Sequence, residues 1–506
     1  MSIGWIYWIS AYVLAILFIQ FRSRKRISPS IWNYPSGTSW VRLAISLSAA
    51  MFSLSSMAGV SSVVNVHGPH GLFFIWSGVM GIGFFPFLFS RWWSKLEVVS
   101  ENEFLALRYA RPWAHRLLAF RSFYLGLLII PLLLALLIKA LADVFIQFFP
   151  DSDIPWLMIS GAMMLLLGLG ASFTTKSRTD ALNLLLFIGL LLFALVRFSW
   201  GVAEPMTGIP SDASTYEEFT MFELFVFLGI QWWSAELQDG SGMEAQHMLG
   251  LNARRKVLYA SWTSKMLLLL VGMAVAFLTL FANTRLGVSG DHSYLAALLH
   301  LLPEELAPVL LVAFIGLAVS TSESFMSWGS GMLIQTKNEW RQSKKKTQIG
   351  RWIMFFIMGF ALLIAHQLES ILEGVKWLLG VTAGVGSVYL MRWFWWRINA
   401  QAQLAAMLGA YLCVPSAYLL IDLFLPSESA PGFAHLLSVA TVLNILLWTT
   451  VAFLTNQERD LMAYAAFRER LQIRWTRKDA LYTTASAVFA FTVLLGCFLL
   501  LEQFLE

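Results

Sequence analysis

The chain has 506 residues, of which 58% are hydrophobic and only 13% are charged, and its mean hydropathy is +0.67. Soluble domains carry nearer a quarter charged residues, and no soluble fold of this length buries so much apolar surface. The composition therefore excludes a soluble protein and indicates one that crosses a lipid bilayer many times. The net charge of +5 does not indicate a nucleic-acid partner, because the basic residues gather on one side of the predicted topology.

The apolar residues form fourteen segments, and a membrane-spanning helix needs roughly 20 such residues. The connecting loops alternate between rich and poor in Lys and Arg, and of 35 such residues only Lys139, Arg197, Arg285 and Lys376 fall on the poor side. Cytoplasmic loops carry the positive excess, so odd-numbered segments are predicted to run inward across the inner (plasma) membrane, with both termini outside. The segments are about 4–20, 41–66, 70–92, 118–149, 155–175, 179–202, 221–236, 257–283, 308–335, 350–367, 371–396, 401–425, 431–455 and 481–505.

Two of these segments are interrupted by polar and small residues. The second, 41–66, contains a series of serines and Gly59, and the seventh, 221–236, is short and runs into a polar stretch at 239–242. Segments 2–6 and 7–11 then form two five-helix units of opposite orientation, each opening with its interrupted segment. This pattern is typical of inverted-repeat transporters, whose broken helices expose backbone at the membrane midplane. The alternative is that Ser and Gly only allow close helix packing.

The ninth segment, 308–335, carries adjacent hydroxyl groups at Ser320 and Thr321 within an apolar run. Hydroxyl and carbonyl oxygens are the ligands that suit a hard cation such as sodium. The stretch Gly-Leu-Ala-Val-Ser-Thr at 316–321 resembles the eighth core helix of the sodium:solute symporter family, which includes sodium-coupled proline, sugar and sialic acid transporters. In that family two neighbouring hydroxyls of this helix ligate the coupling sodium, so the resemblance implies this role for Ser320 and Thr321.

Further stretches resemble the same family in the same order, over about residues 41–400. The run at 46–53 is similar to the first core helix, and the resemblance implies that the carbonyl groups of Ala49 and Phe52 complete the sodium site. Thr179-Asp180 matches a family pair whose carboxylate lies on the inward sodium exit path; the alternative for Asp180 is simple pairing with Lys176 or Arg178. Two more runs look like cytoplasmic motifs of the family, at 103–109 and at 389–399.

Several residues depart from the family pattern and leave the solute and the coupling stoichiometry open. Asn183 stands where the family has Gln, and a charged stretch at 174–178 replaces a glycine-rich turn. Phe325-Met326 replaces a Leu-Asn pair, and Glu323 occupies a position that is usually uncharged. Glu323 is either a sodium or proton site or, as the alternative, a partner for a basic residue.

Outside these runs, two features bear on the solute and on packing. Ser56, Gln231 and Trp232 lie at the two predicted helix breaks and are the candidates for touching the solute, although core packing explains Trp232 equally well. Lys139 and Asp143 are four residues apart, which predicts a structural ion pair on one helix face. The sequence offers no catalytic triad, phosphate loop or metal-spaced Cys/His set, so an enzyme is not predicted.

The sequence thus predicts one all-α integral membrane domain over 1–506, with about 14 transmembrane helices. Its core, about 41–400, is an inverted five-plus-five repeat of the leucine-transporter type, with one helix before it and three after it. The predicted function is sodium-coupled symport of a small organic solute by alternating access, with Na⁺ as the coupling ion. The alternatives are a solute sensor or binding protein that does not transport, and a proton-coupled symporter.

Overall fold

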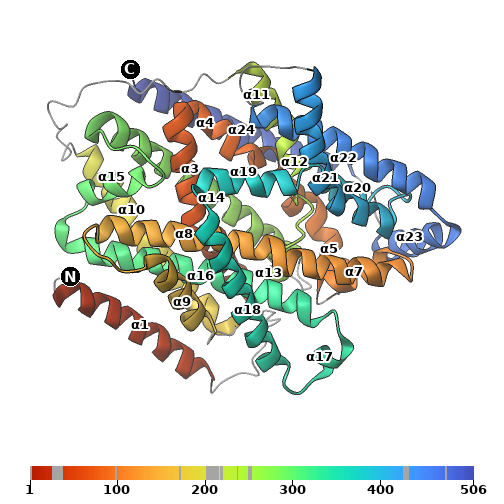
Figure 1. Ribbon diagram of the computed structural model, residues 1–506, viewed down its shortest axis with the longest axis horizontal. Helices are drawn as coiled ribbons and strands as arrows, with labels where there is room; N and C mark the ends of the chain where they lie inside the picture. The colour runs from red at the N-terminus through yellow and green to blue at the C-terminus, as the bar shows by residue number, and fades with distance from the viewer. Residues whose placement is uncertain are drawn as a thin grey trace.

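The computed structural model describes residues 3–24, 38–96, 98, 100–169, 173–200, 216, 220–235, 237–248, 254–424, 432–472, 474 and 476–505. Over these residues the chain forms helices and no strand (Figure 1). The α-helices are α1 (Ile3–Arg24), α2 (Trp40–Met51), α3 (Leu54–His67), α4 (Gly71–Ile75), α5 (Ser90–Leu96), α6 (Glu101–Arg108), α7 (Trp113–Tyr124), α8 (Ile130–Phe148), α9 (Trp156–Gly168), α10 (Phe173–Ser199), α11 (Met221–Val226), α12 (Trp232–Ser234), α13 (Met243–Met248), α14 (Arg254–Phe281), α15 (Ser293–Leu301), α16 (Ala307–Ile334), α17 (Asn338–Gln342), α18 (Lys346–Gln367), α19 (Ile371–Val381), α20 (Val385–Met391), α21 (Ala400–Phe424), α22 (Phe433–Thr455), α23 (Glu458–Leu471) and α24 (Arg477–Leu505).

Every one of the fourteen predicted segments overlaps a helix. Within the described part of the chain, nine helical spans are long and apolar enough to cross a membrane, or ten when the bent pair α19–α20 counts as one. Shorter apolar helices at Tyr7–Ile16, Trp40–Met51 and Trp156–Gly168 account for further predicted segments. The chain is therefore a multi-pass helical membrane protein, as its composition predicts.

The third helix of each predicted five-helix unit, α8 in the first and α16 in the second, shows the direction of its unit. Figure 1 shows α8 running from α7 on the right toward the left, whereas α16 runs from the left toward α17 on the right. The first unit opens with α2 and α3, which are separated at Phe52 and Ser53. The second opens with the helical stretch from α11 to α12, which ends at Ser234, and α13 begins after it at Met243. Each unit thus begins with a broken helix, and the units have opposite directions.

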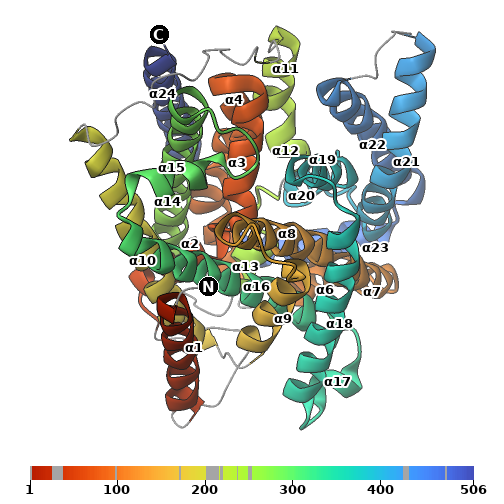
Figure 2. The same ribbon diagram turned by 60° about the vertical axis from the view of Figure 1, so that its left-hand side comes forward.

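Helix α16 forms the centre of the bundle. Its side chains are buried without interruption from Leu310 to Ile334, and it packs against α10, α8, α18, α9, α2 and α1. Because a helix enclosed on every side cannot send polar side chains to solvent, its hydroxyl groups must find partners inside the protein. By contrast, α21 and α22 lie at the periphery of the bundle, on the right of Figure 2.

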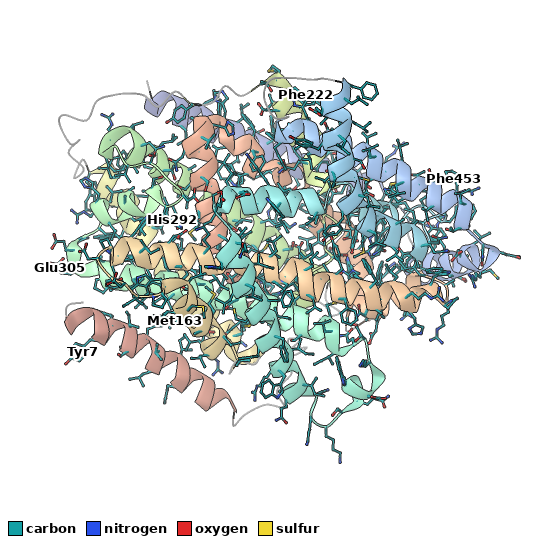
Figure 3. The ribbon with its side chains drawn as sticks, in the orientation of Figure 1. Tyr7, Met163, Phe222, His292, Glu305 and Phe453 are labelled. Atoms are coloured by element: carbon teal, nitrogen blue, oxygen red, sulfur yellow. The ribbon has the colours of Figure 1, made fainter. Side chains whose placement is uncertain are left out.

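The sidedness of the loops agrees with the alternation of basic residues. The beginning of α1 and the end of α24 lie in the left part of Figure 1, together with α15, whereas α17 and α23 lie in its right part. Helices α17 and α23 belong to Lys/Arg-rich loops, and Glu305 of an acidic loop is labelled at the left edge of Figure 3. The labelled parts of the basic and acidic loops therefore lie on opposite sides of this view.

Three local features were not predicted from the sequence. Helix α15 folds within an acidic loop, α23 is a polar helix within a basic loop, and the eleventh segment bends by 50° between α19 and α20. The bend contains Gly384, whose φ of +78° lies in the left-handed region that favours glycine. The predicted ion pair between Lys139 and Asp143 is confirmed, with Nζ 3.8 Å from Oδ2.

The break between α12 and α13 depends on Gly240. Its φ is +81°, and a Cβ at this position would lie 1.9 Å from Cδ2 of Phe85. We expect Gly240→Ala to lower the free energy of unfolding by about 2–3 kcal/mol or more, because it adds a left-handed side chain to a packed site. Thermal unfolding of the detergent-purified protein measures this loss.

Gly189→Ala in the middle of α10 is the matched control. A Cβ there meets nothing within 4 Å, and alanine favours a helix over glycine. Its unfolding temperature should stay the same or rise. Equal losses in the two variants would show that the conformation at Gly240 is not specifically required.

Candidate cation and solute site

The first broken helix exposes carbonyl oxygens inside the bundle. Helix α2 ends at Met51, Phe52 has ψ of 75°, and Ser53 is extended before α3 begins. In a continuous helix the Ser53 amide would bind the carbonyl of Ala49. Here the Ser53 amide donates to the carbonyl of Met51 at 2.9 Å, and the Ser56 amide donates to the carbonyl of Ser53 at 3.1 Å. The carbonyl groups of Ala49 and Phe52 therefore lose their helical partners.

The freed carbonyl of Ala49 faces α16. The hydroxyl of Thr321 donates to the carbonyl oxygen of Ala49 at 3.3 Å. Among the described residues, no hydrogen bond ends on the carbonyl oxygen of Phe52. An unpaired buried carbonyl is costly, and a bound cation is one way to satisfy it. The break and α16 together thus present oxygen ligands of the kind that sodium takes.

Ser320, the other predicted hydroxyl ligand, is positioned by α10 and α1. Asn183 donates from Nδ2 to Ser320 Oγ at 2.9 Å and to the Gly316 carbonyl at 2.9 Å. The hydroxyl of Tyr12 donates in turn to Asn183 Oδ1 at 3.2 Å. The sequence flagged Asn183 only as a departure from the family, and nothing in it pointed to Tyr12, because that contact joins residues 171 positions apart.

Asp180 lies on α10 between α2 and α16. Its carboxylate accepts a hydrogen bond from the Ser46 hydroxyl of α2, and Lys176 Nζ is 3.8 Å from its Oδ2. The pairing with Lys176 that the sequence offered as the alternative is therefore present. Asp180 also lies beside Ser320, so it borders the candidate cation site. Its predicted place on a sodium exit path stays a prediction.

Glu323 lies on the side of α16 that faces α9 and α10. It is 3% exposed, and its Cγ would be 3.3 Å from a Cβ at Gly168 of α9. The charges of Lys176 and Asp180 act on it, and its Oε2 has no hydrogen-bond partner among the described residues. The expected basic neighbour is thus Lys176.

A cavity of about 500 Å³ adjoins the break. Ala50, Met51, Phe52 and Ser53 form one side of it, so the cavity and the candidate cation site share the same backbone. The other lining residues come from α3, α8, α14, α16, α19 and the end of α4: Ser55, Ser56, Met57, Gly59, Val60, Ile75, Trp76, Leu133, Leu136, Leu268, Val271, Gly272, Phe325, Val375 and Leu378. None of these lining residues is ionisable.

The three predicted solute residues have different positions. Ser56 lines the cavity and is exposed to it. Gln231 is not among the lining residues; its Nε2 donates to the Phe74 carbonyl at 3.1 Å, and its Oε1 is buried without a partner among the described residues. Trp232 packs against Phe84, with ring centroids 5.2 Å apart. Of the three, only Ser56 borders the cavity at the break.

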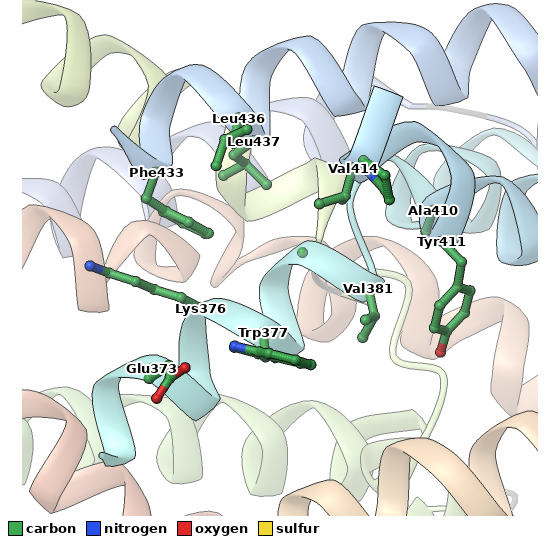
Figure 4. Close-up of a pocket in the computed structure, with 12 residues that line it drawn as sticks. Glu373, Lys376, Trp377, Val381, Ala410, Tyr411, Val414, Phe433, Leu436 and Leu437 are labelled. Carbon is green, nitrogen blue, oxygen red and sulfur yellow. The ribbon is translucent and has the colours of Figure 1, made fainter. Parts of the chain in front are cut away.

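A second cavity, of about 590 Å³, lies on the other side of α19 (Figure 4). Lys376 and Trp377 of α19 line it together with residues of α21 and α22, among them Tyr411 and Phe433. Val375 and Leu378 of the same helix line the cavity at the break. Helix α19 therefore separates two cavities, and neither of its faces is fully packed.

A polar cluster connects the second helix break with α20. The Asp239 carboxylate, which is fully buried, accepts hydrogen bonds from Arg392 and from Nε1 of Trp393, each at 2.8 Å. The Arg108 guanidinium donates to the carbonyls of Arg392 at 2.7 Å and Ile398 at 2.9 Å. The two runs that resemble cytoplasmic motifs, 103–109 and 389–399, are thus in direct contact beneath the break.

Tyr109 belongs to the same cluster. Burial raises the pKa of its hydroxyl, so the phenol stays neutral and donates to Gln403 Oε1 at 2.6 Å. This bond adds α21 to the elements that close this end of the bundle.

The arrangement of helices resembles that of a sodium-coupled symporter of known structure. A sodium-coupled sialic acid symporter, solved in a substrate-bound outward-open state that revealed a novel Na⁺ site, is 16% identical; the match covers 90% of this chain and 98% of that chain, with a TM-score of 0.65. Mhp1, a nucleobase-cation-symport-1 family transporter in a closed conformation with bromovinylhydantoin bound, is 11% identical over 87% of this chain and 99% of that chain, with a TM-score of 0.49. No family model and no curated protein matches the sequence. The fold is therefore the predicted inverted repeat of the leucine-transporter type.

The hydroxyl of Thr321 has the most direct contact with the break, so its removal tests the cation site. We expect sodium, but not potassium, to raise the unfolding temperature, because a ligand that binds the folded state stabilises it. Thr321→Ala should weaken the apparent sodium affinity at least tenfold, or about 1.4 kcal/mol.

Ser322→Ala is the matched control for this experiment. The Ser322 hydroxyl donates to the Val319 carbonyl of its own helix at 3.0 Å and so takes no part in the site. Sodium affinity should be the same in Ser322→Ala and the unmodified protein. If Ser322→Ala weakened sodium binding as strongly as Thr321→Ala, the assignment to Thr321 would be wrong.

Helix α1 should affect the sodium affinity of the same site through Asn183. Tyr12→Phe removes one hydrogen bond to Asn183, and a bond of this kind contributes about 0.5–1.5 kcal/mol. We therefore expect sodium affinity to fall about two- to tenfold. Tyr7→Phe on the exposed face of α1, where Figure 3 labels Tyr7, should leave it unchanged; the same titration of thermal stability measures both.

Proposed function

We propose that the protein is a secondary transporter that couples the entry of sodium to the uptake of a small organic solute by alternating access. The observation that carries this proposal is the helix break at Phe52 and Ser53. The backbone at this break contacts the Thr321 hydroxyl on one side and borders a solute-sized cavity on the other. In this proposal sodium is held by the carbonyls of Ala49 and Phe52 and by the hydroxyls of Ser320 and Thr321.

The shared backbone suggests how the ion and the solute are coupled. Sodium between the break and α16 would fix the position of Phe52, which also lines the cavity. Solute binding would then depend on ion occupancy, and such dependence must be reciprocal. One sodium moving inward across about 100 mV supplies about 2.3 kcal/mol, before any concentration gradient is added.

The cavity favours an uncharged solute. Its lining residues include no ionisable side chain, while Ser53, Ser55 and Ser56 offer hydroxyls on one side and Trp76 and Phe325 offer apolar surface. A volume of about 500 Å³ lies within the usual range for small-molecule sites. We infer a compact neutral solute with hydrogen-bonding groups on one face. A role for Gln231 and Trp232 in binding it remains a prediction.

The proposed membrane orientation follows the basic loops. Helices α17 and α23 would lie in the cytoplasm, and both termini outside the inner membrane. The cluster around Asp239 and Arg392 would then close the cytoplasmic end, and Asp180 would lie on the way from the cation site toward that end. No enzymatic step is proposed, since transport alone accounts for the features described.

Reconstituted vesicles provide the test. Uptake of a labelled panel of sugars, amino acids, sialic acid and carboxylates should show a solute that accumulates only with an inward sodium gradient. Uptake that follows a proton gradient and ignores sodium would favour proton coupling. Specific solute binding without any uptake would favour the sensor alternative.

Filling the cavity should impair solute transport without impairing sodium binding. Ser56→Trp places an indole in the cavity and should lower uptake at least tenfold, while the rise in unfolding temperature with sodium persists. Ser199→Trp at the exposed end of α10 is the control and should transport normally. Unchanged uptake by Ser56→Trp would exclude this cavity as the solute site.

A further inference from the structure

Beside the proposed sodium site the protein carries a cation of its own. The side chain of Lys176 is only 2% exposed, and its ammonium group lies between α10 and α16. Nζ is 3.3 Å from the carbonyl oxygen of Ser320 and 3.8 Å from Oδ2 of Asp180, and it donates to the hydroxyl of Ser324. A carbonyl, a hydroxyl and a carboxylate together form the kind of oxygen cage that holds a hard metal cation.

The contacts go beyond an ion pair within one helix. Lys176 and Asp180 are four residues apart on α10 and could pair without help from any other helix. Two of the ammonium contacts instead belong to Ser320 and Ser324 of α16. Ser320 thus uses its carbonyl for the ammonium, while its hydroxyl belongs to the proposed sodium site. The two cation positions share one residue.

The formal charges of the cluster support the same interpretation. Asp180 is fully buried and Glu323 is 3% exposed, and Lys176 is the basic group acting on both of them. Burying two carboxylates is costly unless nearby positive charge compensates them. The lysine supplies positive charge next to both carboxyl groups.

We propose that the Lys176 ammonium occupies a second cation position beside the sodium site, so that the protein binds and couples to one sodium ion instead of two. This inference rests on the proposed function and specifies its stoichiometry. Ser320, Ser324 and Asp180 would be the oxygen ligands of a sodium ion if the ammonium were absent. Replacing Lys176 by a neutral side chain of similar length should therefore open a second sodium site.

The experiment counts sodium ions bound to the purified protein. Equilibrium binding of ²²Na⁺ at fixed pH, in N-methylglucamine chloride, should give one sodium per unmodified protein with a Hill coefficient near 1. Lys176→Met should bind two, with a Hill coefficient that rises toward 2. Lys176→Arg keeps a cation in place and should bind one.

Lys265→Met is the matched control for the loss of a lysine. Lys265 forms an ion pair with Glu244 at 3.3 Å and has no part in the cluster. Its variant should bind one sodium. Thermal unfolding shows that each variant is folded before ions are counted.

The outcomes separate this inference from the proposed function. Two sodium ions bound to the unmodified protein would overturn the inference without any variant, even if Lys176→Met failed to fold. One ion bound to both the unmodified protein and Lys176→Met would overturn it while sodium coupling stood. No ion bound to the unmodified protein but one bound to Lys176→Met would support the ammonium position and overturn sodium coupling. No binding to either would overturn both.

Discussion

The interaction on which the rest of the structure depends is the contact between the freed Ala49 carbonyl of the first broken helix and the Thr321 hydroxyl of α16. A helix break inside an apolar bundle leaves backbone carbonyls without their helical partners. The Thr321 hydroxyl satisfies the Ala49 carbonyl at 3.3 Å, while the Phe52 carbonyl has no hydrogen bond among the described residues. In the proposed site, a sodium ion at this break would find these oxygen atoms already in place. The break is thus a cost to the fold that the proposed ion would offset.

The surrounding helices hold this contact in place without forming it. Helix α10 positions Ser320 through Asn183 and reaches α2 through Asp180 and Ser46. Helix α1, which precedes the predicted repeat, supports Asn183 through Tyr12. The cavity lies on the opposite side of the same break and shares Phe52 with it. An ion that fixes the break therefore also fixes one wall of the cavity, which is the physical basis of the proposed coupling.

Much of this arrangement can be predicted from the sequence, because bilayer thickness and loop charge constrain it strongly. The fourteen apolar segments overlap helices, and the serine-rich second segment does break, where the resemblance implied free carbonyls at Ala49 and Phe52. The runs 103–109 and 389–399, which resemble motifs of the sodium:solute symporter family, contact each other through Arg108 and Arg392. Some of these features are local sequence patterns. The others belong to the fold, which matches that of the sialic acid symporter over 90% of this chain.

What the sequence could not supply were contacts between helices that no local pattern encodes. Lys176 looked like part of a charged loop, and nothing in its neighbours indicated that it reaches Ser320 and Ser324 of another helix. The sequence marked Glu323 as a departure from the family pattern but did not identify its neighbours. Gln231 and Trp232 were chosen because they lie at a break, yet the break of α12 and α13 turns toward Phe74 and Phe84 instead of the cavity. Side-chain direction at a break is set by tertiary packing.

The central claim is that sodium binds between the broken helix and α16, and hydrogen–deuterium exchange in sodium against equimolar potassium tests it most directly. Sodium is expected to slow exchange in peptides covering 49–57 and 316–324 and to leave exchange in the peripheral helix α22 unchanged. Exchange that is identical in the two ions over 49–57 and 316–324 would contradict it.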